Sequence, residues 1–378
     1  MSLHVLMLWC GSSWGGSMAE WRQTTLDQLV KLQRGHDLPT SQRKVGNVPV
    51  VGAAGPSGTH DTAMVKAPGV VLGRAGASMG KATYCDVDFW PLNTSLYVTD
   101  FLGNDPRFTY YLLDLIDFSG YNSGAAQPML NRNYITQIKI SLPEPSEQKA
   151  IASVVGALED KISINERIAV TSSELAAGHY LATNERESVK IADIANVTMG
   201  QSPPGETFNE QGNGLPFYQG TRDFGFRFPG YRVWCTAVTR QAEANDVLVS
   251  VRAPVGQINV AAELCGIGRG LASVRSEKYP HVLLQALSAD RSIWLPYEAE
   301  GTVFGSINKK QFTQLEIGWP TAAFVDSLES RLSTLDQRIR RATGESRTLA
   351  TLRNTLLPQL MSGKLRVREA EKIVEDAV

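Results

Sequence analysis

The sequence contains few cysteines and histidines, and neither type is spaced for metal binding. Its four cysteines, Cys10, Cys85, Cys235 and Cys265, and its five histidines form no CxxC or HxxxH pair. This spacing argues against a disulfide framework or a zinc site and is consistent with a reducing cytoplasm. No apolar run approaches the roughly 18 residues that a bilayer span needs, so we expect a soluble protein without a membrane segment.

The chain also lacks an excess of charge of either sign. Lysine and arginine total 37 and aspartate and glutamate total 38, which gives a formal net charge of −1. Bulk electrostatics therefore select no class of partner, and binding to nucleic acid would require basic residues gathered locally.

The length and the apolar content indicate several globular domains. A chain of 378 residues, 43% of them hydrophobic, is long enough for two or three domains with cores of their own. The first seventeen residues lack the basic region of a signal peptide before the apolar run Leu3–Cys10. We expect residues 1–17 to be a leader from an upstream start or an added segment, and the protein to begin near Met18.

An internal repeat organises the chain. The segment from Asn131 to Pro143 returns from Asn308 to Pro320, with Asn, Thr-Gln, Ile and Pro recurring at an offset of 308 − 131 = 177 residues. The same offset relates Leu158–Ile162 to Leu335–Ile339. Looser matches upstream relate Leu26–Leu29 to Ile191–Ile194 and residues 70–81 to residues 247–257, and this consistent order indicates a duplication.

Each half predicts a mixed α/β domain followed by a long helix. In the first half we expect helices at 26–32 and 108–118 and strands at 70–73 and 96–98. In the second half we expect helices at 191–197 and 281–287 and strands at 248–251 and 258–261.

Apolar residues at alternating three- and four-residue steps predict the two long helices. The first series is Ile151, Val154 or Val155, Leu158, Ile162, Ile168 and Leu175, with Asn165 on the same stripe. The second is Val325, Leu328, Leu332, Leu335, Ile339, Ala342, Leu349, Leu352 and Leu356, and we expect it to end at Pro358. Such steps are typical of a coiled coil, although each helix could instead pack on its own domain.

If the helices pair, they must run antiparallel, with a domain at each end and a pseudo-twofold relation between the halves. A rod of about 45 Å over thirty residues suits a ligand with two similar, separated sites. DNA is the obvious candidate because its major groove recurs about every 34 Å. Asn165 could fix the register of the pair, or could lie at an exposed edge.

With these features the chain resembles the specificity subunits of type I restriction-modification systems. The run Leu142-Pro-Glu-Pro-Ser-Glu-Gln148, with Leu158–Ile162 after it, resembles the central spacer of that family, and Leu356–Val367 resembles the end of its C-terminal spacer. The resemblance implies target-recognition domains at 18–145 and 185–320. It further implies spacer helices at 146–184 and 321–367, with a tail at 368–378.

The resemblance implies a non-catalytic subunit that reads a bipartite, asymmetric sequence in double-stranded DNA. Its implied partners are modification subunits, which bind S-adenosylmethionine and methylate adenine, and restriction subunits, which cleave DNA with ATP and Mg. The competing interpretation is a coiled-coil scaffold with two protein-binding domains.

The residues themselves offer little for catalysis. The sequence has no GxxxxGK[ST] loop and no Asn/Asp-Pro-Pro-Tyr segment. The Gly266–Gly270 run superficially resembles a phosphate loop, but we expect no helix after it, and its counterpart in the first half is Phe89–Asn93. Asp86 and Asp88 are the only tempting carboxylate pair, and we expect both to be solvated.

Basic and amide side chains in glycine-rich loops are the candidates for contacts with DNA, because Arg and Lys can pair with guanine and Asn and Gln with adenine. The candidates of the first domain are Arg74, Ser78, Lys81, Asn131 and Arg132. Those of the second are Gln201, Tyr218, Gln219, Arg222, Arg252, Gln257, Lys309 and Lys310, with Arg252 taken as the equivalent of Arg74.

Overall fold

The computed structural model describes residues 21–124, 128–298 and 305–377, so the leader expected at 1–17 lies outside the described residues. The chain divides into two compact units. Unit 1 comprises Met1–Ile162 and Arg347–Val378, and unit 2 comprises Ser163–Ser346. Within the described ranges, no helix combines the length and the apolar character of a membrane span.

Unit 1 is built on a four-stranded antiparallel sheet. Its order is β2 (Lys31–Arg34), β8 (Ser95–Asp100), β5 (Gly69–Gly73) and β6 (Ala82–Cys85). Helix α1 (Pro106–Leu115) packs Phe108 and Tyr111 into the same core as Val70 and Leu72 of β5. All five residues of β5 are buried, which explains its uninterrupted apolar and glycine sequence.

The remaining elements of unit 1 flank this sheet. A smaller sheet has the order β4 (Gly55–His60), β3 (Val48–Gly52) and β7 (Trp90–Pro91), with β7 parallel to β3. Strands β1 (Arg22–Thr25) and β9 (Lys139–Leu142) form an antiparallel pair, and the short helix α2 (Arg132–Ile135) precedes β9.

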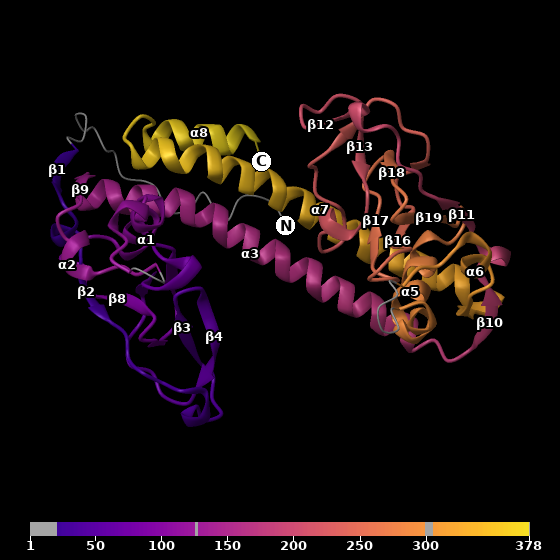
Figure 1. Ribbon diagram of the computed structural model, residues 1–378, viewed down its shortest axis with the longest axis horizontal. Helices are drawn as coiled ribbons and strands as arrows, with labels where there is room; N and C mark the ends of the chain where they lie inside the picture. The colour runs from indigo at the N-terminus through magenta and orange to yellow at the C-terminus, as the bar shows by residue number, and fades with distance from the viewer. Residues whose placement is uncertain (1–20, 125–127, 299–304, 378) are drawn as a thin grey trace. The chain divides into compact units, whose positions relative to one another are not determined.

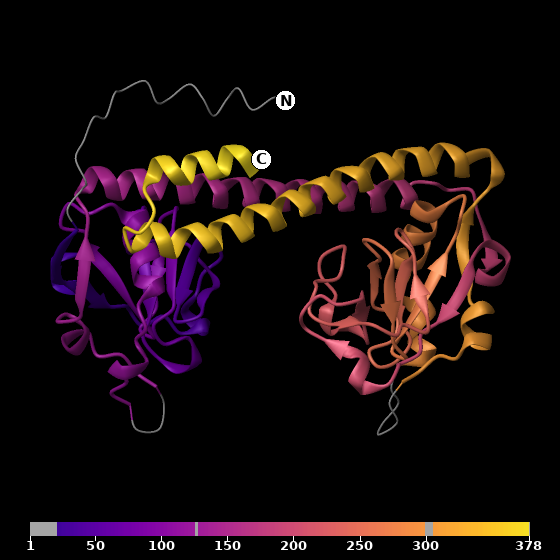
Figure 2. The same cartoon turned by 90° about the horizontal axis from the view of Figure 1, so that it is seen from above.

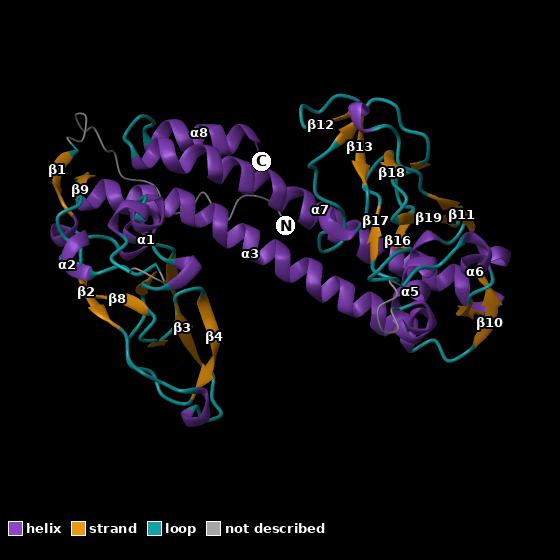
Figure 3. Cartoon of the chain, viewed as in Figure 1, coloured by secondary structure: helices purple, strands orange, loops and turns teal. Residues whose placement is uncertain are grey.

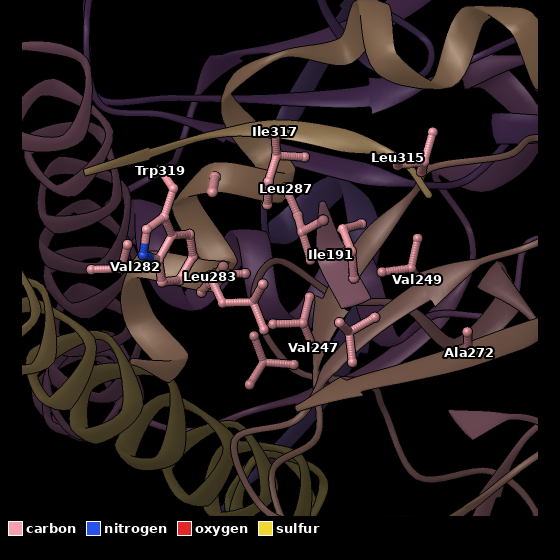
Figure 4. Close-up of a cluster of buried hydrophobic side chains, with 14 of the residues drawn as sticks. Ile191, Val247, Val249, Ala272, Val282, Leu283, Leu287, Leu315, Ile317 and Trp319 are labelled. Carbon is pink, nitrogen blue, oxygen red and sulfur yellow. The ribbon is translucent and has the colours of Figure 1, made fainter. Parts of the chain in front are cut away.

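Unit 2 repeats this plan. Its antiparallel sheet has the order β11 (Asn196–Met199), β19 (Leu271–Arg275), β16 (Val247–Ser250) and β17 (Ile258–Val260). Helix α5 (Pro280–Ala289) corresponds to α1, and Figure 4 shows its Val282, Leu283 and Leu287 packed with Val247 and Val249. The pair β10 (Arg186–Lys190) and β20 (Glu316–Pro320) corresponds to β1 and β9.

The smaller sheet is more elaborate in unit 2. Its order is β12 (Phe208–Asn209), β14 (Trp234–Cys235), β13 (Leu215–Tyr218), β18 (Cys265–Ile267) and β15 (Gln241–Ala242). Strand β18 runs parallel to β13, as β7 does to β3. The short helices α4 (Ile191–Ile194) and α6 (Lys309–Thr313) complete the unit, whose strands and helices are distinguished by colour in Figure 3.

Matching hydrogen bonds confirm the internal repeat. The N–H of Leu26 donates to Ile138 O in unit 1, and that of Ile191 donates to Leu315 O in unit 2. The N–H of Leu130 donates to Arg74 O, and that of Ile307 donates to Val251 O, at an offset of 307 − 130 = 177 residues. The two globular domains therefore share one topology.

The two long helices pair antiparallel, as predicted. The beginning of α3 (Pro145–Leu181) shares a core with the end of α7 (Ala322–Met361) in unit 1, where Ile151 and Leu158 join Leu349 and Leu356. In unit 2, Ala169 of the later part of α3 clusters with Ile339 and Ala342 of α7. Figure 1 shows the two ribbons side by side within each unit.

The helices also pack on their own domains, so the two interpretations offered from the sequence hold together. Val325, Leu328, Leu332 and Leu335 of α7 belong to the same core as β16 and α5. Ile151, Val155 and Leu158 of α3, with Ile162 partly buried, belong to the core of β5 and α1.

The predicted stripe of α3 is wrong at its end. Ile168 and Leu175 are 41% and 49% exposed, whereas Asn165 is only 2% exposed and donates to Glu345 Oε2. The buried stripe continues the seven-residue spacing of Ile151 and Leu158 through Asn165 and Ser172. Small and polar side chains thus continue the buried stripe, where the sequence analysis expected the large apolar Ile168 and Leu175 to do so.

Several other expected boundaries are wrong. Residues 26–32 form only a 3₁₀ turn at Leu26–Gln28 before the strand β2, and residues 191–197 form the one-turn helix α4 before β11. Pairing with β8 and β19 overrides the local helical pattern in each case. The helix expected at 108–118 ends at Leu115, although Phe118 is buried.

Helix α7 does not end at Pro358. It continues to Met361 because Leu360 and Met361 are buried in the core of unit 1, and this burial offsets the one helical hydrogen bond that the proline removes. The residues expected as a tail form α8 (Val367–Ala377), whose Ala370 is fully buried. In Figures 1 and 2, α8 is the yellow helix beside the end of α7.

Candidate nucleic-acid interface

A polar pocket lies beside the main sheet of unit 1. It has a volume of about 740 Å³ and is formed by the end of β2, the residue after β5 and the chain before α2. The residues that line it are Gln33, Arg34, Gly35, His36, Asp37, Arg74, Leu96, Ser123, Met129, Leu130, Asn131 and Arg132.

Three arginines from three separate elements converge on this pocket. The guanidinium of Arg74 approaches Met129 Sδ at 3.5 Å, and Arg132 Nη1 lies 3.5 Å from Leu32 O. Arg34 Nη2 lies 3.9 Å from Asp37 Oδ1, which also accepts a hydrogen bond from the Asn93 amide. With three cations against one carboxylate, the pocket is suited to an electron-rich ligand.

Three of the five candidates of the first domain line the pocket, namely Arg74, Asn131 and Arg132. Ser78 and Lys81 lie outside the lining, in the turn that joins β5 to β6, where the N–H of Lys81 donates to Ser78 O. The Lys81 side chain is exposed and Ser78 is half-buried.

Arg34 and His36 are pocket residues that the sequence analysis missed. They were missed because the sequence analysis expected a helix at 26–32 and assigned Arg34 to no helix or strand. The signal was present in the repeat: Gly35 follows β2 as Gly200 follows β11, so His36 corresponds to the candidate Gln201.

The recurring asparagine of the repeat caps a short helix. Asn131 Oδ1 accepts from the N–H of Asn133 at the start of α2. Asn308 Oδ1 accepts from the N–H of Gln311, and Gln311 Oε1 accepts in return from the N–H of Asn308. This is the usual role of asparagine at the beginning of a helix and explains its recurrence without reference to a ligand.

In unit 2, two candidate amides lie in one cluster of loops. The N–H of Gln201 donates to Ile267 O, and Gln219 Nε2 donates to Ser202 Oγ at 2.5 Å. The N–H groups of Gly268 and Gly270 donate to the carbonyls of Tyr218 and Gln219. The end of β11, the end of β13 and the loop after β18 are thereby brought together.

Two candidates of the second domain are corrected by the structure. Tyr218 is only 3% exposed and belongs to a small apolar core, so its ring is not placed to reach a ligand. Arg252 is exposed but is not the equivalent of Arg74. The matching hydrogen bonds show that Val251 corresponds to Arg74, so Arg252 corresponds to Ala75. Gln257 does correspond to Lys81, since their carbonyls accept from Ser250 and Gly73.

The three remaining candidates of unit 2 are exposed. Lys309 and Lys310 open α6, and Lys309 occupies the first helical position that Arg132 occupies in α2. Arg222 lies in the 3₁₀ turn Thr221–Asp223, just after β13 and Gln219.

Asp88 and the Gly266–Gly270 run, the motifs considered for catalysis, make contacts that belong to the fold. Asp88 accepts hydrogen bonds from Lys66 Nζ at 2.7 Å and from the Ala67 N–H at 2.9 Å, and these bonds lower the pKa of its carboxyl. Asp86 is exposed. The Gly266–Gly270 run leads into β19 and not into a helix, as predicted. Among the described residues, no three His, Cys, Asp or Glu side chains are grouped to hold a metal ion.

Comparison with known proteins adds sequence and fold evidence. Residues 18–171 match the model of the type I restriction modification DNA specificity domain. The MjaX specificity subunit of a type I restriction enzyme from Methanocaldococcus jannaschii is 29% identical in an alignment 266 residues long, which covers 64% of this chain and 63% of that protein. The chain thus spans under two thirds of this relative's length.

A solved structure shares the fold. The S subunit of the type I restriction-modification system from M. genitalium matches with a TM-score of 0.71 at 16% identity, over 92% of this chain and 98% of that one. At this identity the match shows a shared fold, and the two sequence matches support the family resemblance stated from the sequence.

Proposed function

We propose that this chain belongs to the type I DNA specificity family and recognises a bipartite, asymmetric sequence in double-stranded DNA. Each unit reads one half of the site. The chain supplies recognition and no catalysis, and it works in the cytoplasm with modification subunits that use S-adenosylmethionine and restriction subunits that use ATP and Mg.

One observation carries this proposal: the two units share a topology but present different side chains at the same loops. Arg74 and Arg34 line the pocket of unit 1, whereas Val251 and Met199 stand at the corresponding positions of unit 2. A common scaffold with different polar groups is what two unlike half-sites require, since base edges are distinguished by their donors and acceptors.

The proposal is tested by exchanging the reading parts. The chain is produced with its own modification subunits in a host without adenine methylation, and the modified bases are sequenced. We expect methylation at one bipartite motif. Replacing residues 22–142 with the corresponding residues of a homologue that directs another motif should change one half of the motif only.

Two controls define the outcome. The chain without modification subunits should give no methylation, and exchange of residues 186–320 should change the other half of the motif. Methylation independent of this chain, or a change in both halves after a single exchange, would contradict the proposal and favour a scaffold that binds only protein.

A further inference from the structure

We propose that unit 1 reads a G·C base pair in its half of the site, with Arg34 or Arg74 contacting the guanine. This inference rests on the proposed function and specifies its chemistry. An arginine can donate two parallel hydrogen bonds to O6 and N7 of guanine in the major groove, and no other base offers that pair of acceptors.

Arg74 is held by backbone bonds on both sides. Its N–H donates to Thr94 O at 3.0 Å, and its carbonyl accepts from the N–H of Leu130 at 2.8 Å. Its guanidinium, in contrast, contacts only the weak acceptor Met129 Sδ, and within the described part of the chain it forms no ion pair. A fixed backbone with uncommitted donors is the arrangement expected of a residue that reads a ligand.

Arg34 has an equally fixed backbone. It pairs with Leu96 at the end of β2, and the next residue, Gly35, packs so closely that a Cβ there would lie 2.2 Å from Leu92 O. Its side chain is 54% exposed and lies 3.9 Å from Asp37, a separation and exposure at which an ion pair contributes little to stability.

Arg34 and Asp37 together match a G·C pair. In the major groove, guanine presents two acceptors and its partner cytosine presents the N4 amino donor beside them. The guanidinium of Arg34 and the carboxylate of Asp37 offer donors and an acceptor next to each other. An A·T pair presents an adenine amino group where guanine has O6, and that group cannot accept from an arginine.

The corresponding positions of unit 2 cannot make this contact. Register with the neighbouring strand places Met199 at the position of Arg34, and Val251, which is buried, stands where unit 1 has Arg74. A guanine contact from these two positions is therefore assigned to unit 1 and not to unit 2.

The experiment uses the complex of the full chain with its modification subunits and a duplex that carries its methylation motif. Each guanine of the motif is replaced in turn by 7-deazaguanine, which lacks the N7 acceptor. We expect one replacement, in the half assigned to unit 1, to weaken binding about tenfold to a hundredfold. The alanine variant of the arginine that reads this guanine, Arg74→Ala or Arg34→Ala, should cause at least this loss on the unmodified duplex. Its effect on the modified duplex should be smaller, because 7-deazaguanine keeps only the O6 acceptor.

Two more variants separate reading from charge. Arg74→Lys and Arg34→Lys keep the positive charge but remove the pair of parallel donors. At the residue that reads guanine, this substitution should retain non-specific DNA binding but lose the discrimination between guanine and other bases. Arg22→Ala removes an exposed arginine of β1 outside the pocket and should leave specificity unchanged.

The inference is overturned if 7-deazaguanine is harmless throughout that half, or if the alanine variants weaken all sequences equally, which would make both arginines phosphate contacts. These outcomes leave the proposed function intact. Binding without any sequence preference would instead mean that the proposed function itself has failed.

Discussion

The two units use different side chains to hold corresponding ten-residue helices, α1 in unit 1 and α5 in unit 2, against the long helices. In unit 1, Arg107 of α1 pairs with Asp160 at 2.7 Å and with Glu159 at 3.6 Å, both on α3. In unit 2, His281 follows Pro280 as Arg107 follows Pro106. His281 contacts Glu329 of α7 at 2.6 Å and Asp336 of α7 at 3.8 Å.

The beginnings of the two helices are also capped differently. In unit 1, Asp105 caps α1 locally, accepting from the N–H groups of Arg107 and Phe108 at 2.9 Å. In unit 2, the side chain of Tyr279 provides no cap. Glu329 of the long helix accepts instead from the N–H groups of His281 and Val282. The beginning of the helix is therefore capped in both units. A neighbouring residue provides the cap in unit 1, and a residue of the long helix provides it in unit 2.

A third difference lies at the beginning of the long helices. Gln148 of α3 is only 1% exposed; it accepts from the N–H of Asp105 and donates to Asn104 Oδ1 and Pro143 O. At the 177-residue offset, α7 carries Val325, which is 4% exposed and belongs to the core of unit 2. Unit 1 therefore relies on a buried amide at a position where unit 2 relies on apolar packing.

The largest effect is expected from Glu329→Ala in unit 2. The change removes the acceptor of two backbone N–H groups of α5 and the partner of His281, and the Glu329 side chain is only 15% exposed. We expect the free energy of opening of α5 to fall by about 3 kcal/mol. Hydrogen exchange of residues 280–289, followed by mass spectrometry, measures this loss.

Asp326→Ala is the matched control for this change. Asp326 lies one turn earlier on α7 and contacts Tyr279 and Lys278, but its side chain is 71% exposed. We expect a loss below about 1 kcal/mol. Equal effects of the two substitutions would show that the cap from α7 does not stabilise α5.

A smaller loss is expected from Gln148→Val in unit 1, which copies the residue of unit 2. The substitution leaves the N–H of Asp105 and the carbonyl of Pro143 without their partner. We expect the amides of α1 to lose about 2 kcal/mol of protection against hydrogen exchange. Lys149→Ala, at the exposed neighbour, should have no measurable effect. Full tolerance of valine would mean that the amide network is dispensable.

The repeat and the paired helices could be predicted because both are written as periodic patterns. The series Leu328, Leu332, Leu335 and Ile339 is buried as expected. The strands at Val70 and Leu248 were also evident, since a fully buried strand leaves a continuous apolar run.

What the sequence could not predict depends on contacts between distant residues. Gln148 looks like an ordinary polar residue near a helix start, and only its three partners reveal it as buried. The pocket escaped for the same reason, because Arg34 and Arg74 are forty residues apart in sequence (74 − 34 = 40) and meet through the sheet that contains β2 and β5. The predicted alignment of Arg74 with Arg252 was wrong by a single residue. The matching hydrogen bonds reveal this shift, whereas the loose sequence similarity does not.

The smallest effect expected is a gain. Asn165 is a polar residue in the buried stripe of α3. Seven residues earlier, in unit 1, the same stripe carries the apolar Leu158. Its partner Glu345 is only half-buried, so the Glu345 carboxylate keeps access to water if the amide is lost. We expect Asn165→Leu to stabilise the pairing of α3 with α7 by about 1 kcal/mol, because a buried asparagine in such a stripe costs stability. Hydrogen exchange of residues 163–176 measures the gain, and Ile168→Ala at an exposed position of the same helix is the control. A loss on Asn165→Leu would show that its hydrogen bond contributes more than apolar packing at this position.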